Sequence, residues 1–296
     1  MNHEKHKYEI KHTSPHHKSV KKRKIKLKNI IILLIGLISL ITLIYSIINI
    51  VNWEDDNVEI KKQLQEIDEI VQVEIVEEST DNENIEIIEQ KTEIKKDNPY
   101  WDYIKMNLIN VDFTELKKKN KDTAGWIQVN GTNINYPFVQ TKNNDYYLTH
   151  SFDKSYNQAG WVFLDYRNNK KLSDKNNIIY AHSRLNNTMF GTLKKTLESN
   201  WQNNTNNHIV KISTESENSL WQVFSVYHIE ETSDYIKTSF KDNQEFLTLT
   251  KKLIDRSVYN FNTEVNENDI ILTLSTCYGK TERMVLHAKL IKKEIK

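Results

Sequence analysis

The stretch from Ile270 to Leu290, IILTLSTCYGKTERMVLHAKL, decides the fold that this sequence predicts. Two runs of strand-like alternation flank a five-residue break, Tyr278 to Glu282, which is typical of a β-hairpin. If Cys277 pairs with Arg283 across the break, one face of the hairpin is nearly all apolar. Its residues are Ile270, Leu272, Leu274 and Thr276 opposite Leu290, Ala288, Leu286 and Met284. We expect this face to be buried, because a shift of one residue would bury Lys289 and Arg283 instead.

The other face of the hairpin places the chain's only cysteine beside an arginine at the open tip. Its residues are Thr273, Ser275 and Cys277 opposite His287, Val285 and Arg283. A thiol attacks a carbonyl carbon as the thiolate, and neighbouring cations such as Arg283 and Lys280 lower its pKa from about 8.5. A guanidinium can also donate hydrogen bonds to the oxyanion that forms. The pair favours acyl transfer, although a buried, inert cysteine beside a surface arginine is the commoner arrangement in proteins.

Charge is segregated along the 296 residues, although the net charge is only +1. Residues 1–28 are rich in Lys and Arg and predict a basic cytoplasmic tail. Residues 29–53 carry no charge and are long enough to cross a hydrocarbon core of about 30 Å as one helix. This run is too long for a cleaved signal peptide and lacks a small-residue cleavage site. Basic residues before it and acidic residues after it predict a cytoplasmic N-terminus and an extracellular remainder.

Residues 54–97 are strongly acidic and contain no glycine, proline or aromatic residue. Their apolar residues sustain neither the helical nor the strand period. This composition favours a solvated linker or stalk, extended or partly helical. A coiled coil that dimerises the anchor is the alternative.

Composition changes at residue 98, and the part of the chain from 98 to 296 is long enough for one well-filled core. Two short helices are predicted, around residues 101–108 and after a cap near Asp112 or Thr114. Short strands are predicted at 126–129, 134–139, 160–164, 178–181, 208–212 and 220–228, with helices inserted at 190–197 and 243–258. Many short strands with few helical insertions predict a mainly β fold, a largely antiparallel barrel or sandwich. Nucleic acid is not an expected partner, because the only basic block lies in the tail.

A nucleophilic cysteine needs a basic partner, and a single extracellular cysteine cannot form an internal disulfide. The candidate histidines of this part of the chain are His150, His182, His208, His228 and His287. His182 is the best of them, because it follows the apolar strand 177–181 and precedes a polar loop, where a side chain can face a cleft. His287, on the polar face of the hairpin, is the second choice. No Cys/His spacing typical of zinc is present, and no metal site is expected.

Several motifs of residues 98–296 together resemble the sortases, and within them class B. They are TLSTC (273–277) with an arginine in the next strand, IIYAHS (178–183), AGWIQVNGTNINYPFVQ (124–140), NNDYYL (143–148) and AGWVFLDYRN (159–168). The resemblance implies a closed β-barrel with N-terminal helices and a helix before the hairpin, which the 243–258 helix fits. Two departures are Ala181, where the family often has glycine, and a short loop between Cys277 and Arg283.

The resemblance also implies roles for individual residues. Cys277 would be the nucleophile, His182 the general acid and base, and Arg283 the group that stabilises the oxyanion or the substrate. The residues that match sorting-signal contacts of the class are Asn144, Leu148, Tyr235, Ile236 and Ser275. This chemistry needs no cofactor.

The sequence therefore predicts a cysteine transpeptidase held in the plasma membrane of a Gram-positive-type bacterium by residues 29–53, with its catalytic domain outside. It would cleave a C-terminal sorting motif of secreted proteins after threonine and join the thioacyl intermediate to an amine of peptidoglycan or its lipid-linked precursor. Three alternatives remain: a pilin-polymerising sortase, a hydrolytic cysteine peptidase, and a non-catalytic binding domain on a stalk.

Overall fold

The computed structural model describes residues 26–76, 85–88, 96, 98–278 and 281–296. Most of the basic tail predicted at 1–28 therefore lies outside the described residues, as does Lys280 beside the hairpin tip. The chain divides into two units, residues 1–51 and 52–296, which are considered separately.

The first unit contains the start of α1 (Leu27–Ile70). Within the described residues, α1 is the one helix that is long and apolar enough to cross a membrane, and it lies near the N-terminus. The apolar side chains of its first part are exposed, as a segment that faces lipid requires. The length and composition of α1 therefore agree with the anchor predicted at residues 29–53.

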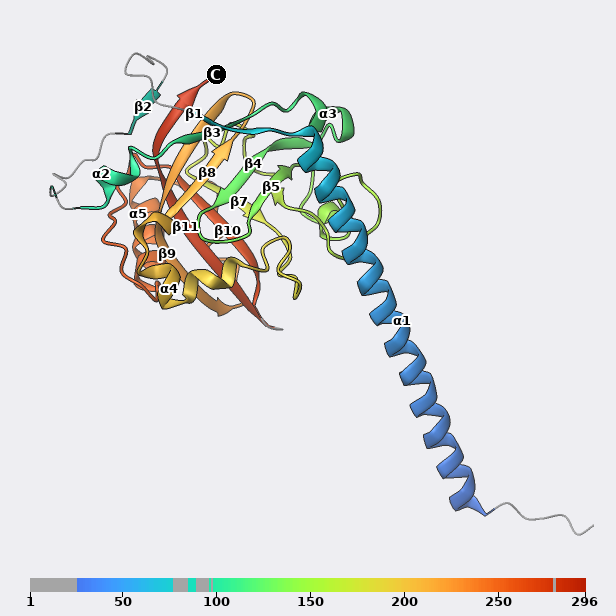
Figure 1. Cartoon of the computed structure of the whole chain (residues 1–296). Coiled ribbons are helices and arrows are strands. Elements are labelled where there is room, and N and C mark those ends of the chain that lie inside the picture. Colours follow the sequence, from blue (N-terminus) through green and yellow to red (C-terminus); the bar gives the residue numbers. More distant parts are fainter. Residues whose placement is uncertain (1–25, 77–84, 89–95, 97, 279–280) are drawn as a thin grey trace, which may run out of the picture. The chain divides into compact units, whose positions relative to one another are not determined.

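In the described part of the second unit, eight strands close into a barrel in the order β10-β7-β6-β5-β4-β8-β9-β11, and β10 pairs with β11 to complete it. Their bounds are β4 (Thr123–Val129), β5 (Asn135–Val139), β6 (Phe163–Leu164), β7 (Asn176–Tyr180), β8 (Ile209–Ser213), β9 (Glu217–Glu230), β10 (Ile271–Tyr278) and β11 (Glu282–Ile295). The β5–β6 and β7–β10 pairs are parallel and the other pairs of the barrel are antiparallel. The predicted closed, mainly β barrel is confirmed (Figure 1).

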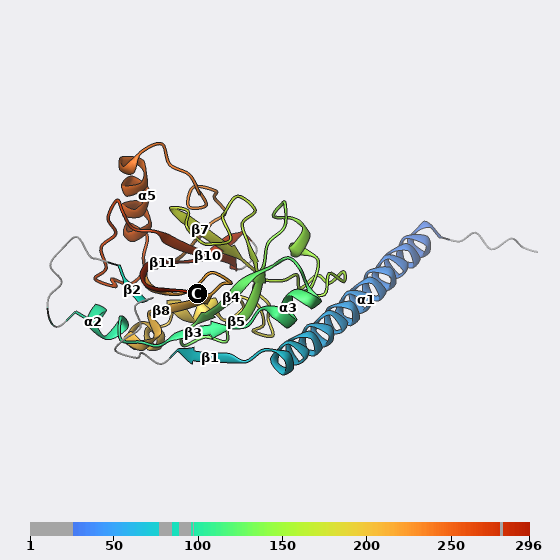
Figure 2. The same ribbon diagram turned by 90° about the horizontal axis from the view of Figure 1, so that it is seen from above.

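The hairpin of β10 and β11 has the predicted register, with Cys277 opposite Arg283. Six of the residues predicted for its apolar face belong to the main core, with Leu272 and Leu286 fully buried, and Ile270 packs against that core. The opposite face is also buried, which the alternating pattern did not predict. Helix α5 (Asn243–Asp255) covers it and packs Phe246, Leu249 and Leu253 on β9, β10 and β11 (Figure 2).

Lys289 lies on this covered face and is buried, which the sequence did not predict. Its side chain is only 3% exposed although the register is the predicted one. Its ammonium lies 3.5 Å from Asp269 Oδ2 and donates to the carbonyl oxygen of Glu264 at 2.6 Å. A buried lysine is tolerated only with such partners. Sequence alternation could not reveal them, because both come from the segment that follows α5.

Residues 54–76 differ from the solvated linker that their acidity predicts. Helix α1 continues to Ile70, and its last turns bury Ile60 and Ile67 against the barrel unit. Strand β1 (Val73–Val76) then pairs with β3 (Leu108–Val111). The apolar residues are spaced by three or four along one helical face while the acidic residues occupy the rest, so one stripe packs and the others stay solvated.

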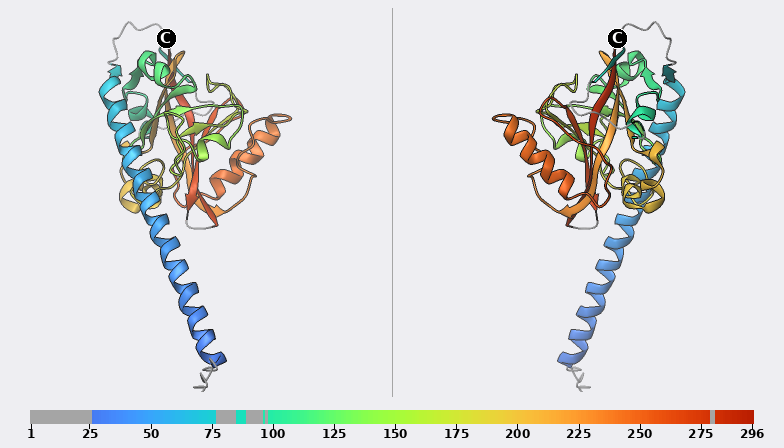
Figure 3. Two further views of the ribbon diagram at one scale, coloured as in Figure 1. Left: turned by 90° about the vertical axis from the view of Figure 1, so that its right-hand side faces the viewer. Right: turned by 90° about the vertical axis from the view of Figure 1, so that its left-hand side faces the viewer.

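The remaining elements are short and lie around the barrel (Figure 3). They are β2 (Ile85–Ile87), α2 (Tyr100–Tyr103), α3 (Thr114–Lys119), η1 (Tyr146–Leu148), η2 (Leu193–Leu197), α4 (Ser199–Gln202) and η3 (Thr205–Asn207). The helix predicted at 101–108 is wrong beyond its first turn, because Leu108 begins a strand. The helix predicted to start near Asp112 or Thr114 is present at 114–119. The helix predicted at 243–258 is present and ends at Asp255; Asp242 caps it, and its side chain accepts from the Glu245 N–H at 2.9 Å.

Candidate active site

The ends of β7, β10 and β11 bring the three predicted catalytic residues to one end of the barrel. Strands β7 and β10 are parallel, with Tyr180 beside Ser275, and the Ala181 N–H donates to the Ser275 carbonyl at 3.4 Å. His182 lies two residues after Tyr180, and Cys277 lies two residues after Ser275. Because β11 places Arg283 opposite Cys277, the backbone makes these three residues neighbours.

A cleft of about 300 Å³ opens at this end of the barrel. It is lined by Asn144, Asp145, Leu148, Phe163, Tyr180, Ala181, His182, Ser275, Thr276 and Arg283. His182 and Arg283 thus share one cavity with three of the five predicted substrate contacts. The other two lie behind its wall: Tyr235 is buried and its hydroxyl is 3.0 Å from Ser275 Oγ, while the Ile236 carbonyl accepts from Arg167 at 3.0 Å.

His182 is held by a backbone carbonyl. Its Nε2 lies 2.7 Å from the carbonyl oxygen of Leu148. A carbonyl oxygen only accepts, so Nε2 carries a proton and the neutral ring keeps Nδ1 as its basic nitrogen. Gly160 makes this approach possible, since a Cβ on it would lie 2.9 Å from Leu148 O and 3.0 Å from His182 Cδ2.

Arg283 is also fixed in place while remaining 22% exposed. Its Nη2 lies 2.6 Å from Glu231 Oε1, and Nη1 donates to the Glu282 carbonyl at 3.1 Å. A guanidinium has five N–H donors, so these bonds orient the group and leave donors for a ligand in the cleft. The site can thus present a cation with directed N–H groups beside the backbone of Cys277.

His287, the second choice for the basic partner, has a structural role instead. Its ring is fully buried, with Nδ1 2.9 Å from Thr273 Oγ1 and Nε2 2.9 Å from the Tyr227 hydroxyl. The Thr273 hydroxyl donates to Asn176 at 2.7 Å, so it accepts from Nδ1–H, and Nε2 accepts from Tyr227. Burial lowers the pKa of His287 to about 3. With both nitrogens engaged and neutral, the ring cannot serve Cys277.

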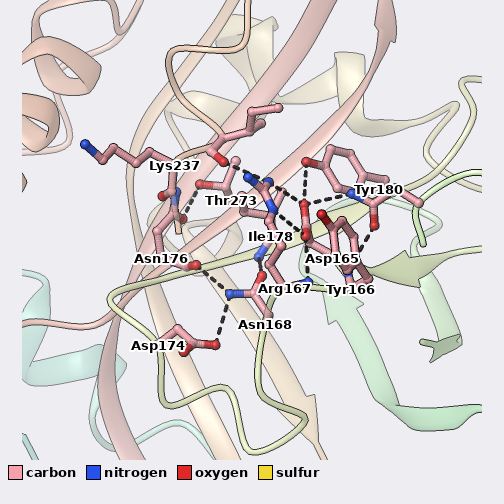
Figure 4. Close-up of polar contacts among 12 residues, drawn as sticks. Asp165, Tyr166, Arg167, Asn168, Asp174, Asn176, Ile178, Tyr180, Lys237 and Thr273 are labelled. Carbon is pink, nitrogen blue, oxygen red and sulfur yellow. Dashed lines mark hydrogen bonds and ion pairs between the residues drawn. The ribbon is translucent and has the colours of Figure 1, made fainter. Parts of the chain in front are cut away.

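Sequence reasoning missed a buried carboxylate beside the cleft, that of Asp165 (Figure 4). Arg167 donates to it from Nε at 2.8 Å and from Nη2 at 2.6 Å, and the Tyr180 hydroxyl donates at 3.1 Å. Burial alone would raise the pKa of Asp165, but the hydrogen bonds from Arg167 and Asn144 outweigh it and lower the pKa below its ordinary value. Acidic and basic residues directly after the apolar strand β6 were the available signal.

Metal binding finds no support in the side chains that the structure describes, since they contain no group of three or more His, Cys, Asp or Glu residues placed to hold an ion. The proximity of His182 and Arg283 to the Cys277 backbone is instead suited to nucleophilic chemistry.

Known proteins similar to this chain fall in one family. The Sortase domain family matches residues 127–291. Sortase B of Listeria monocytogenes is 37% identical over 62% of this chain and 75% of its own length, and sortase B of Staphylococcus aureus is 35% identical over 62% and 76%. The solved complex of Staphylococcus aureus sortase B with a substrate has a TM-score of 0.57 and 35% identity, over 61% of this chain and 84% of the solved one.

Proposed function

Because this chain belongs to the sortase family of cysteine transpeptidases, we propose that it cleaves a C-terminal sorting motif of secreted proteins after threonine and joins the new end to an amine of the cell wall. The observation that carries the proposal is the strand register, which makes Cys277, His182 and Arg283 neighbours at one end of the barrel. The Staphylococcus aureus sortase B has been solved as a substrate complex, which supports substrate binding by this related chain.

In the proposed reaction, Nδ1 of His182 first takes the proton of the Cys277 thiol. The resulting thiolate attacks the threonine carbonyl, and Arg283 donates hydrogen bonds to the oxyanion that forms. His182 gives its Nδ1 proton to the leaving amine while Nε2–H stays on the Leu148 carbonyl. The peptide bond breaks and a thioacyl bond to Cys277 remains. An incoming amine then gives its proton to Nδ1 and attacks the thioester, which releases the thiolate and forms the new amide.

The peptide would lie in the cleft next to His182. Asn144, Leu148 and Ser275 line this cleft and are proposed contacts, and Tyr235 and Ile236 would shape its wall. The incoming amine would come from peptidoglycan or its lipid-linked precursor. No cofactor takes part in these steps.

The proposed location rests on the apolar segment. Residues 29–53 would anchor the chain in the plasma membrane of a Gram-positive-type cell, with the N-terminus in the cytoplasm and the barrel outside. An anchor of this kind keeps the enzyme near both secreted proteins and lipid-linked wall precursors.

The test uses the full chain in detergent micelles with fluorogenic peptides of the form x-P-x-T-x, with and without diaminopimelate or oligoglycine. Cys277→Ala, His182→Ala and Arg283→Ala are the variants. We expect cleavage that needs all three residues and a ligated product when an amine is present. Hydrolysis without a ligated product, whether or not an amine is present, would indicate a hydrolytic peptidase. A ligated product that forms only when a pilin lysine is supplied as the amine would indicate a pilin polymerase. No cleavage and no thioacyl adduct with any peptide would indicate a binding domain.

A further inference from the structure

We propose that Asp165 is a positioning residue that fixes the side-chain amide of Asn144, so that the cleft selects a peptide with a hydrogen-bond acceptor at the position facing Asn144. The inference rests on the proposed function for the identity of the ligand, a sorting peptide. It concerns selectivity, which can be measured without turnover.

Asp165 cannot itself act as an acid or base. Its side chain is 0% exposed and its two oxygens accept five hydrogen bonds. Three come from Arg167, through its backbone N–H, Nε and Nη2, and the others from Asn144 Nδ2 and the Tyr180 hydroxyl. A carboxylate with saturated lone pairs has no capacity left for substrate. Its effect must pass through the groups that it holds.

The Asn144 amide is held at both ends, which fixes its orientation. Nδ2 donates to Asp165 Oδ2 at 3.0 Å, and Oδ1 accepts from the Tyr166 backbone N–H at 3.0 Å. A flipped amide would place its oxygen against the carboxylate and its N–H groups against another N–H donor. Because Nδ2 has two protons and one is used, one N–H remains for the cleft that Asn144 lines. That donor is matched by a carbonyl acceptor on the peptide.

The same carboxylate ties three walls of the cleft together. Tyr180 belongs to the end of β7, two residues before His182, and Arg167 Nη2 also donates to the carbonyl of Ile236 at 3.0 Å. Asn144 comes from the loop before η1. The arrangement requires a negatively charged acceptor at position 165, since Tyr180, Arg167 and Asn144 all donate to it. In Asp165→Asn, the two N–H groups of the new amide would face the donors that the carboxylate now accepts from, and those contacts would be lost.

Asp165→Asn, which keeps the shape and removes the charge, is the main variant. It is made in the full chain with Cys277→Ala, in detergent micelles, and binding is measured by fluorescence anisotropy. Peptide pairs carry either Asn or Gln, or the apolar Leu or Met, at each variable motif position. We expect the Cys277→Ala chain to prefer the amide peptide at one position, and Asp165→Asn to reduce that preference about tenfold, the effect of one net hydrogen bond. Preferences at the other positions should stay unchanged.

Asp174→Asn is the matched control. Asp174 belongs to the same polar network, accepting from Asn168 Nδ2 at 3.1 Å and from the Asn169 N–H at 2.6 Å, but it does not line the cleft. It should leave the preference intact. Asn144→Leu should abolish the preference, and Asp165→Asn should then have no further effect on it. If Asp165→Asn gives no cooperative melting transition, Arg167→Lys decides, because it keeps the charge but loses the fork and should reduce the preference partially.

A positioning role also differs from loss of structure in turnover. In the chain that retains Cys277, Asp165→Asn should raise KM for motif peptides more than it lowers kcat, and alkylation of the thiol by iodoacetamide should keep its rate. An unchanged preference in Asp165→Asn, an equal loss in Asp174→Asn, or no preference in the Cys277→Ala chain would each overturn the inference. Failure of the wild type to ligate any peptide would instead overturn the proposed function and leave the binding result to stand.

Discussion

Gly160→Ala should impair catalysis in addition to destabilising the fold, because a Cβ on Gly160 would contact the Leu148 carbonyl and the His182 ring. Its φ is +60°, a region that costs a residue with a Cβ about 1–2 kcal/mol. The new Cβ would lie 2.4 Å from the Tyr147 carbonyl oxygen, whereas such contacts are essentially never below 3.0 Å. The backbone around Tyr147 and Leu148 must therefore move by about 0.6 Å.

That movement falls on the bond that orients His182. The Nε2···O distance to Leu148 is 2.7 Å, and a shift of this size brings it to the outer limit of a hydrogen bond. A hydrogen bond to a charged group contributes about 1.5–3 kcal/mol, so losing it when the ring carries two protons lowers kcat/KM by roughly 10- to 100-fold. The free energy of unfolding, measured in urea, should fall by about 2–4 kcal/mol in total.

The assay compares ligation rate per folded molecule with the free energy of unfolding, both in the full chain. Gly131→Ala is the matched control, since Gly131 also has a positive φ, +72°, and its Cβ would lie 2.5 Å from Asn207 and 2.8 Å from Trp201, away from the cleft. It should destabilise the fold comparably and leave the rate per folded molecule unchanged. Wild-type rates in Gly160→Ala, or an equal loss of rate in Gly131→Ala, would refute the role assigned to the Leu148 carbonyl.

Three further predictions concern stability. Ile60→Ala should lower the free energy of unfolding in urea by about 2–5 kcal/mol, because α1 packs this residue in the core. For the same reason, a chain that begins at residue 98 should unfold at a lower urea concentration than one that begins at residue 52. Equal midpoint concentrations of urea would contradict the packing. Since burial lowers the pKa of His287 to about 3, the unfolded chain binds one more proton between that pH and about 6.5, so stability should fall on acidification by up to about 1.4 kcal/mol per pH unit in this window, and His287→Phe should flatten that slope. Lys289→Met should cost about 3–5 kcal/mol in thermal or urea unfolding by leaving Asp269 buried without its cation, and adding Asp269→Leu should restore much of the loss.

The hairpin and the strand that precedes His182 could be predicted because neighbouring residues in the sequence determine both of them. Alternation around Cys277 sets the register of β10 and β11, because a shift of one residue would have turned Lys289 and Arg283 into the barrel core. The N-cap and apolar spacing of α5 are equally local. The sequence motifs alone also implied that His182 and Cys277 act together. The parallel pairing of β7 with β10 agrees, because it brings the ends of the two strands side by side.

What could not be predicted depends on residues far apart in the chain. Acidic composition hid the packing of residues 57–67, because one apolar stripe is enough to bury a helix that is otherwise solvated. Lys289 and His287 seemed suited to solvent or catalysis, yet α5 and the segment after it cover both. Asp165 is a further example, since the donors that lower its pKa include Asn144, whose position follows only from the closed barrel.

The segment from Asn144 to Leu148 joins the two halves of the site. Strand register gives His182, Cys277 and Arg283 their neighbouring backbones, but it does not aim a side chain. At one end of the segment the Leu148 carbonyl fixes the His182 ring, and at the other end Asp165 fixes the Asn144 amide. Only three residues separate Asn144 from Leu148, and η1 ends at Leu148, so we expect a distortion at either end to reach the other. Proton transfer and peptide selection are therefore expected to depend on the same short segment, while the pairing of β10 with β11 keeps Cys277 opposite Arg283.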